Sequence, residues 1–225
     1  MVDKVTFAHG NEFVTLVFPA RDHMWSYITR HRNFYEMDLL LKIKEIMPEA
    51  STIVDVGGYI GNHSVFFAMH FAEVHTFEPN KNIHPYLEQN LQDFHNVSIQ
   101  KCALGNMVGT GDFRIPVVGE QYLSFVDFDP GMMIENPVKV DLLDNYYIDA
   151  DVIKIDTEGA EIEVLKGASQ TIEEYKPELF VECREDKDFK KTLEYLEPLG
   201  YIPMDHYAFT PVWHFHHPDR KGVRP

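Results

Sequence analysis

Positive charge is scarce in this sequence. Its 225 residues include 20 lysines and arginines against 36 aspartates and glutamates, which gives a formal net charge of −16 at pH 7. Nucleic acids and anionic membranes bind basic surfaces, so this balance disfavours nonspecific binding to either of them. We therefore expect neither a nucleic-acid partner nor a membrane partner.

Long apolar runs and cysteine are scarce as well. No run reaches the ~20 residues that a membrane-spanning helix requires, and the N-terminal M-V-D-K-V-T lacks the apolar core of a signal peptide. The two cysteines, Cys102 and Cys183, fall in predicted strands. We expect buried, reduced thiols rather than a disulfide. Together these absences predict a cytoplasmic protein.

One stretch, T-I-V-D-V-G-G-Y-I-G from Thr52 to Gly61, predicts a ligand site. Its β-branched start is typical of a buried strand in a parallel sheet. Gly57 and Gly58 allow a tight turn with close backbone approach to a ligand, and residues 62–69 are expected to form the following helix. A strand, a glycine turn and a helix bind nucleotide-like ligands at the carboxyl end of the strand.

The predicted ligand is not a dinucleotide, because the turn lacks the G-x-G-x-x-G fingerprint. Asp55 precedes the glycines, where its charge would repel a pyrophosphate and suits a ligand with a cationic or polar group. Glu78, in T-F-E-P, ends the next predicted strand roughly 20 residues later, where an acid can accept hydrogen bonds from ribose hydroxyls. A glycine turn and a ribose acid without a phosphate loop fit S-adenosylmethionine (SAM) better than NAD or ATP.

The rest of the chain predicts one α/β domain of ordinary composition, with 44% hydrophobic and 25% charged residues. Strands and helices alternate, which argues for a parallel sheet with right-handed crossovers. Residues 105–140 break this rhythm and are too long for a plain connection, so we expect them to shape the acceptor side. We predict strands at 52–56, 73–77, 97–102, 151–155, 178–183, 200–205 and 207–215, helices at 34–47, 62–70, 82–93, 141–147, 160–175 and 187–197, and an N-terminal β-hairpin at 4–18.

Four motifs in order resemble the FkbM family of SAM-dependent methyltransferases. They are D-V-G-G-Y-I-G at 55–61, F-E-P at 77–79, C-A-L-G at 102–105 and I-K-I-D-T-E-G-A-E-I-E-V-L-K-G-A at 153–168, the most specific of the four. The resemblance implies a Rossmann-like, seven-stranded class I methyltransferase sheet with one reversed strand and helices on both faces. It divides the chain into a hairpin and lid or helix extension (1–48), a methyltransferase domain (49–217) and a C-terminal tail (218–225).

The resemblance also implies a SAM site. In class I methyltransferases the first turn holds the methionine part, the acid after the second strand holds the ribose, and the adenine lies after the third strand. The alternatives are that Asp55 caps a helix, that Glu78 is a solvated strand end, and that residues 102–104 are ordinary core. The predicted cofactor-binding residues are Asp55, Gly57, Gly58, Tyr59, Gly61, Asn62, His63, Glu78, Pro79, Cys102, Ala103, Leu104 and Asp156.

Acidic residues predict the catalytic end of the site. Asp156 and Glu158 follow a predicted strand, where an acid could orient the SAM amino group or deprotonate an acceptor hydroxyl. Stabilisation of the next helix is the alternative. Glu182 ends a neighbouring apolar strand and is a second candidate acid, or a structural partner of Lys154 or Arg184. If these three acids converged they would also suit a hard cation, although we predict no metal site.

The histidines provide further candidates. His63 could touch SAM or the acceptor, and His206, at the end of the predicted strand 200–205, could act as a general base. For His214 and His216 we expect exposed C-terminal side chains rather than zinc ligands, because no cysteine or carboxylate lies at metal spacing. A lid is expected from Tyr27, His31, Phe34, Tyr35 and Glu36, with core packing as the alternative for the aromatic residues.

The sequence therefore predicts a SAM-dependent O-methyltransferase. FkbM relatives typically methylate hydroxyls, so we expect a glycan or natural-product acceptor. The alternatives are a non-catalytic SAM-binding module, an acidic protein-interaction module and, less favoured, an NAD(P)-dependent oxidoreductase. A homodimer formed through the N-terminal hairpin is left open.

Overall fold

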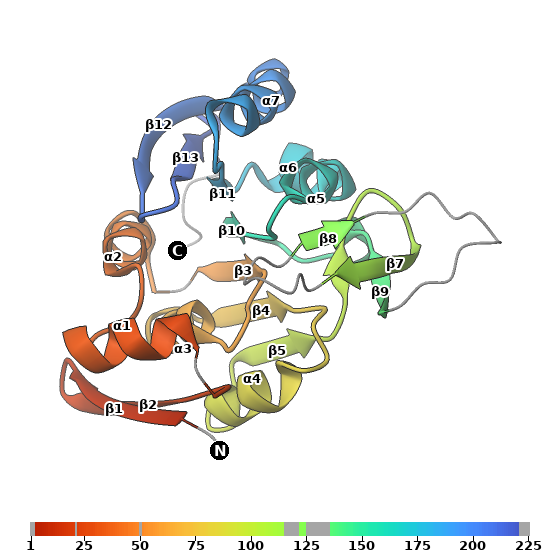
Figure 1. Ribbon diagram of the computed structural model, residues 1–225. Helices are drawn as coiled ribbons and strands as arrows, with labels where there is room; N and C mark the ends of the chain where they lie inside the picture. Colours follow the sequence, from red (N-terminus) through yellow and green to blue (C-terminus); the bar gives the residue numbers. More distant parts are fainter. Residues whose placement is uncertain (1–2, 21, 50, 115–121, 125–135, 221–225) are drawn as a thin grey trace.

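A seven-stranded mixed sheet forms the centre of the protein. The computed structural model describes residues 3–20, 22–49, 51–114, 122–124 and 136–220. The sheet contains β3 (Thr52–Val56), β4 (Glu73–Phe77), β5 (Val97–Gln100), β10 (Val152–Ile155), β11 (Glu178–Glu182), β12 (Ile202–Tyr207) and β13 (Val212–His216). Its order is β12-β13-β11-β10-β3-β4-β5 (Figure 1), and β13 runs antiparallel to both of its neighbours. The prediction of one reversed strand is confirmed.

Helices cover both faces of the sheet, so the domain has three layers. On one face α2 (Met37–Ile46), α3 (Asn62–His70) and α4 (His84–Leu91) pack against Ile53 and Val152. On the other, α5 (Glu161–Gly167), α6 (Ser169–Tyr175), α7 (Asp186–Leu196) and the 3₁₀ turns η1 (Leu143–Tyr146) and η2 (Glu197–Leu199) cover Val54 and Ile153. Successive strand residues point to opposite faces, which is why the central strands β3 and β10 are buried on both faces.

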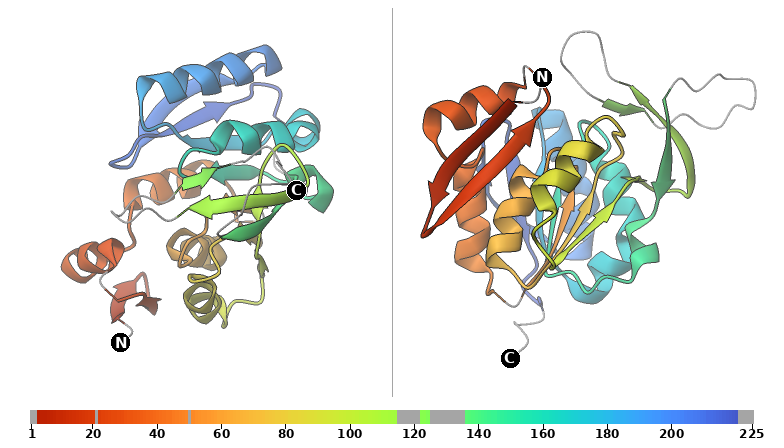
Figure 2. Two further views of the ribbon diagram at one scale, coloured as in Figure 1. Left: turned by 45° about the vertical axis from the view of Figure 1, so that its right-hand side comes forward. Right: turned by 90° about the horizontal axis from the view of Figure 1, so that it is seen from below.

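The N-terminal segment forms a two-stranded hairpin outside the main sheet, as predicted, followed by a helix that the sequence does not reveal. The hairpin is β1 (Asp3–His9) and β2 (Glu12–Phe18), and the helix is α1 (His23–His31). Asn90 on α4 ties the hairpin to the domain, because its side chain bonds the Val17 backbone N–H at 2.8 Å and carbonyl at 3.0 Å. Figure 2 shows this unit beside the α3 and α4 face.

Part of the irregular region 105–140 forms a second small sheet. Its strands are β6 (Ala103–Leu104), β7 (Gly109–Arg114), β8 (Tyr122–Ser124) and β9 (Pro137–Asp141), in the order β6-β9-β7-β8. Residues 115–121 and 125–135 lie outside the described residues, so the prediction that this whole region shapes the acceptor side stays a prediction. The helix expected at 141–147 is the shorter η1.

The single helix expected at 160–175 is wrong, because the chain breaks at Ala168 into α5 and α6. Gly167 packs its backbone against the carbonyl of Gly105, and a Cβ at Gly167 would collide with that oxygen. Asp144 then caps the new helix start, since its carboxylate accepts the N–H of Gln170 at 3.0 Å and of Thr171 at 2.9 Å. Both causes are long-range contacts that the local pattern does not contain.

The C-terminal histidines are buried or half-buried rather than exposed, which corrects a second expectation. Glu178 at the start of β11 accepts His214 Nε2 at 2.7 Å and His216 Nδ1 at 2.9 Å. Arg220 NH1 lies 3.4 Å from the same carboxylate, so the first residues of the expected tail are anchored. Burial would raise the pKa of Glu178, but the two histidines outweigh it and lower the pKa.

Both cysteines, Cys102 and Cys183, are free and buried, just beyond β5 and β11 rather than within them. Within the described ranges, no helix combines the length and the apolar character needed to cross a membrane.

Substituting Gly167→Ala should destabilise the protein by about 1–3 kcal/mol, the usual cost of overpacking, although alanine normally favours a helix. The cause is the collision of the new Cβ with the Gly105 carbonyl. Gly109→Ala is the matched control, because a Cβ there meets nothing within 4 Å. Urea unfolding of both variants measures the difference, and equal midpoints would contradict the close contact.

Candidate active site

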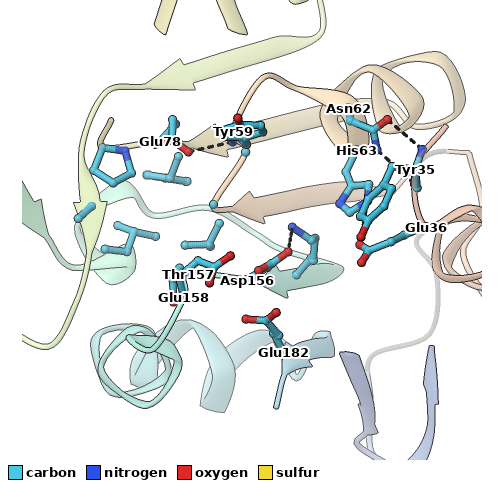
Figure 3. A pocket seen from close by; sticks show the side chains of 18 of the residues that line it. Tyr35, Glu36, Tyr59, Asn62, His63, Glu78, Asp156, Thr157, Glu158 and Glu182 are labelled. Carbon is cyan, nitrogen blue, oxygen red and sulfur yellow. Dashed lines mark hydrogen bonds and ion pairs between the residues drawn. The ribbon is translucent and has the colours of Figure 1, made fainter. Parts of the chain in front are cut away.

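A cavity of about 260 Å³ opens at the carboxyl ends of β3, β4, β10 and β11. In Figure 3, Glu78 and Tyr59 lie at one end, His63, Tyr35 and Glu36 at the other, and Asp156 between them. Most of the predicted site residues meet here although they come from four separate motifs. The cavity is lined by Gly57, Gly58, Tyr59, Asn62, His63, Glu78, Pro79, Cys102, Ala103, Leu104, Asp156, Glu158 and Glu182 from that set.

A buried ion pair forms the floor of the cavity. Lys154 on β10 lies directly opposite Asp55 on β3 in the sheet register, with Nζ 3.2 Å from Asp55 Oδ1 and 3.4 Å from Asp156 Oδ2. Burial alone would lower the pKa of Lys154, but Asp55 and Asp156 outweigh it and hold the pKa above its ordinary value. The lysine therefore stays charged and neutralises the acids below the site.

The Asp55 side chain does not line the cavity, which corrects its predicted place among the cofactor-binding residues. Its carboxylate is fully buried and is used by Lys154 and by the Ser64 hydroxyl, which donates to Oδ2 at 2.6 Å. Gly61 is likewise structural. It begins α3 in the left-handed region (φ 88°), with its Cα against Leu87 and Leu91.

The two glycines of the turn are required by the packing of strand ends. A Cβ at Gly57 (φ 85°) would collide with the backbone carbonyl of Asp156, and one at Gly58 would collide with the Thr76 hydroxyl. The turn therefore lies flat against β10 and β4. This brings the backbone of both glycines to the cavity wall, where we expect close approach to a ligand.

Glu78 presents a buried carboxylate at the first end of the cavity. One oxygen accepts the backbone N–H of Tyr59 at 2.9 Å and the other that of Asn80 at 2.7 Å. Burial raises the pKa of Glu78 to about 7, although these two hydrogen bonds oppose the shift. Its remaining lone pairs are suited to accept hydroxyl donors from a ligand.

The N-terminal segment closes the cavity over the turn. Asp22 caps α1 through Oδ1, and its Oδ2 accepts the hydroxyl of Tyr59. His23 and Met24, which follow Asp22, line the cavity. Burial, reinforced by Asp22, raises the pKa of Tyr59, so the phenol stays a hydrogen-bond donor.

Asn62 joins the same segment to α3. Its Oδ1 accepts the Tyr35 N–H at 3.1 Å and its Nδ2 donates to the Tyr35 carbonyl at 3.2 Å. This pairing places Tyr35 and Glu36 in the cavity wall. Of the residues expected to form a lid, Tyr35 and Glu36 are the two that line the cavity. Phe34 is core, and Tyr27 stacks on His31 with ring centroids 4.2 Å apart.

Two further acids, Glu182 and Glu158, lie along the side of the cavity below Asp156 and Glu78 in Figure 3. Glu182 is buried, with Oε2 3.1 Å from Arg184 Nε, and Glu158 at the rim also pairs with Arg184. Burial, followed by the charge of Asp156, raises the pKa of Glu182 to about 9. Glu182 is therefore a neutral acid near pH 7, and it can donate a hydrogen bond into the cavity.

His63 lies beside Glu36, at the end of the cavity opposite Glu78. Its Nε2 lies 3.3 Å from Glu36 Oε2, closed off from solvent and without an aligned hydrogen bond among the described residues. The imidazole ring is packed 6.3 Å from that of Phe67, centroid to centroid. A buried, unsatisfied ring nitrogen at a cavity wall is unusual, since most such groups have a hydrogen-bond partner.

His206 is not part of the site, contrary to prediction. It lies on the edge strand β12, half exposed, with its ring 4.9 Å from that of Trp213. Glu161, at the start of α5, accepts the backbone N–H groups of Thr157 and Gly159 in the preceding loop. In the described part of the chain, no group of three or more His, Cys, Asp or Glu residues could hold a metal ion.

Sequence reasoning missed several wall residues. It suggests Lys154 only as a partner of Glu182, although a lysine inside the apolar run V-I-K-I is itself a signal of a buried pair. His23, Met24 and Thr210 carry no motif and reach the cavity through tertiary contacts alone.

Glu182→Gln should remove a pH dependence of stability. The folded-state pKa of about 9 lies above the ordinary 4.5, so the folded protein binds more protons than the unfolded chain between these values. The free energy of unfolding must then fall as pH rises through this window. Relative to Glu182→Gln, the wild type should lose at least ~1.4 kcal/mol, the equivalent of one pKa unit. Urea unfolding near both ends of the window tests this, and parallel curves would contradict it.

Solved structures with a similar fold include three useful relatives. An FkbM methyltransferase from Methylobacillus flagellatus KT has a TM-score of 0.57 and 20% identity, covering 75% of this chain and 44% of that one. An rRNA methylase from Streptococcus thermophilus has a TM-score of 0.50 and 14% identity, covering 79% and 92%. A Streptococcus mutans protein described as a methyltransferase, solved in complex with SAH, has a TM-score of 0.52 and 12% identity, covering 80% and 95%.

At these identities the similarities show the fold, a class I methyltransferase α/β sheet. The chain spans less than half the length of the Methylobacillus protein. No curated protein matches it significantly. The family model of the methyltransferase FkbM domain matches residues 55–203, well over half of the 225 residues. The chain therefore belongs to the FkbM methyltransferase domain family.

Proposed function

We propose that this protein transfers a methyl group from SAM to a hydroxyl oxygen. The observation that carries the proposal is the cavity at the carboxyl ends of β3, β4 and β10, which joins a glycine turn and a buried strand-end carboxylate in an FkbM-family fold. The same edge of the sheet is where open α/β folds bind their ligands.

The residues of this chain fit SAM. The two carboxylate oxygens of Glu78 can accept the ribose hydroxyls, and the buried stretch Cys102–Leu104 offers an apolar wall to the adenine. The flat turn at Gly57 and Gly58 leaves room for the methionine part. The SAH complex of the Streptococcus mutans protein, which shares the fold, is consistent with this ligand.

Three acids of the cavity suit a sulfonium cation and the acceptor beside it. In Figure 3, Asp156 lies between the two ends of the cavity, Glu182 lies below it, and Glu158 lies on the side of Glu78. When bound, SAM supplies an electrophilic methyl group on a positively charged sulfur. The task of the chain is to align the acceptor oxygen with the methyl–sulfur bond and to accept the hydroxyl proton.

The proposed acceptor is a neutral hydroxyl compound, a glycan or a natural product. A net charge of −16 and an acid-lined cavity oppose a polyanion. RNA remains the competing acceptor, because the Streptococcus thermophilus neighbour is an rRNA methylase. The roles assigned to individual residues, and a division at residue 48 between extension and catalytic domain, are parts of the proposal.

At a pH above its pKa of about 7, where Glu78 is ionised, Glu78→Gln should weaken SAM binding at least ~10-fold, because hydrogen bonds to a charged acceptor are worth about 1.5–3 kcal/mol. Glu73→Gln, at the exposed opposite end of the same strand, is the matched control and should bind as the wild type does. Calorimetric titration with SAM and S-adenosylhomocysteine measures both. Equal affinities for the two variants would refute the ribose role, and absence of binding to the wild type would refute the cofactor.

Turnover is tested by release of S-adenosylhomocysteine with methyl glycosides, cyclohexane-1,2-diol or transfer RNA as acceptors. Methylation of a glycoside or diol supports the proposal, and methylation of RNA alone would replace its acceptor class. SAM binding without turnover on any of them would favour a binding module.

A further inference from the structure

We propose that His63, held by Glu36, is the group that takes the proton from the acceptor hydroxyl. The inference rests on the proposed function and names its catalytic base. It also places a residue of the N-terminal segment, outside the family-matched range 55–203, in the reaction machinery.

The geometry of the pair fixes which ring nitrogen is used. Nε2 of His63 is sealed against Glu36, 3.3 Å from Oε2. The contact is electrostatic, since Nε2 has no aligned hydrogen bond among the described residues. A carboxylate this near favours the tautomer with the proton on Nε2, which makes Nδ1 the nitrogen that can accept a proton from a bound molecule. His63 lines the cavity at the end opposite Glu78.

Glu36 is placed for this role by two independent constraints. Its backbone adopts the left-handed region (φ 56°) at the start of α2, and its neighbour Tyr35 is pinned by the Asn62 amide. Asn62 directly precedes His63 on α3. One short segment of helix therefore positions both the imidazole and the carboxylate that faces it.

The other acids of the cavity are less suited than His63 to accept a proton. Asp156 forms an ion pair with Lys154, with Oδ2 and Nζ 3.4 Å apart, and Glu158 at the rim forms one with Arg184. Burial and Asp156 raise the pKa of Glu182 to about 9, so this side chain already carries its proton near neutral pH. Glu182 then serves as a hydrogen-bond donor that orients the acceptor.

The step balances without any further reactant. A lone pair of the acceptor oxygen forms the new O–CH₃ bond as the CH₃–S bond of SAM breaks and its electron pair passes to sulfur. The hydroxyl proton moves to Nδ1 of His63. The imidazolium is stabilised by the carboxylate of Glu36, and S-adenosylhomocysteine and the methyl ether are released.

The first test is independent of turnover. NMR of the histidine ring nitrogens at a single pH identifies His63 as the signal lost in His63→Asn. The wild type should show the tautomer with its proton on Nε2, and Glu36→Gln should weaken that preference, because the carboxylate facing Nε2 is lost. Glu45→Gln, exposed on α2, is the control. A tautomer preference that is unchanged in Glu36→Gln would overturn the pairing.

The second test uses whichever glycoside or diol the wild type methylates. His63→Asn should lower kcat at least ~100-fold, as expected for loss of a general base, with SAM affinity unchanged. His70→Asn, the same change on the same helix outside the cavity, should keep wild-type kcat. Glu36→Gln should also lower kcat with SAM affinity unchanged, because the imidazolium formed in the step loses its stabilising charge.

The two proposals fail in different ways. If the wild type methylates an acceptor and His63→Asn retains its kcat, the base assignment is wrong and the proposed function stands. If the wild type binds SAM but methylates nothing, the proposed function fails and the assignment fails with it. Should His63→Asn lose SAM binding through misfolding, Glu36→Gln still decides through its kcat.

Discussion

The buried pair of Lys154 and Asp55 is the constraint on which the site depends. Removing two charges from water is costly and is offset only when the geometry is complete. Here the hydrogen bonds that complete the pair come from three strands and a helix. The Asp55 carboxylate accepts from Lys154 Nζ and from the Ser64 hydroxyl, and the Ser64 hydroxyl also lies 3.0 Å from the Thr76 hydroxyl on β4. Because the loss of one partner of such a pair typically costs about 3–5 kcal/mol, β3, β4, β10 and α3 are held in one arrangement.

The turn geometry follows from that arrangement. With β3 and β10 fixed in register, Gly57 must pass directly over the carbonyl of Asp156, and Gly58 over Thr76. The cavity wall is thus set by packing before any ligand is considered. The opposite wall is supplied from elsewhere, by Met24, Glu36 and Thr210, all outside the family-matched range. The ligand-facing surface therefore combines a family-typical half with a half particular to this chain.

The sequence predicts the elements that depend on local pattern and fails where distant partners decide. The strands 52–56 and 73–77 and the helix 62–70 agree with the structure, because β-branched runs and the glycine turn are local signals. The motif residues gather as expected because parallel strands bring their carboxyl ends to one edge. The break at Ala168 depends on Asp144 and the burial of His214 on Glu178, both far away in the sequence, and His206 is excluded because β12 lies at the edge of the sheet. No period or spacing in the sequence records those contacts.

The order of the last strands has a consequence for how the chain folds. β12 precedes β13 in sequence but joins the sheet only through it, at the outer edge. During synthesis β12 therefore has no place in the sheet until residues 212–216 have emerged and paired with β11. Thr210, in the connection between them, completes the cavity wall at the same moment. The wall of the cavity is therefore complete only after residues 212–216 have paired with β11 and β12 has paired with them.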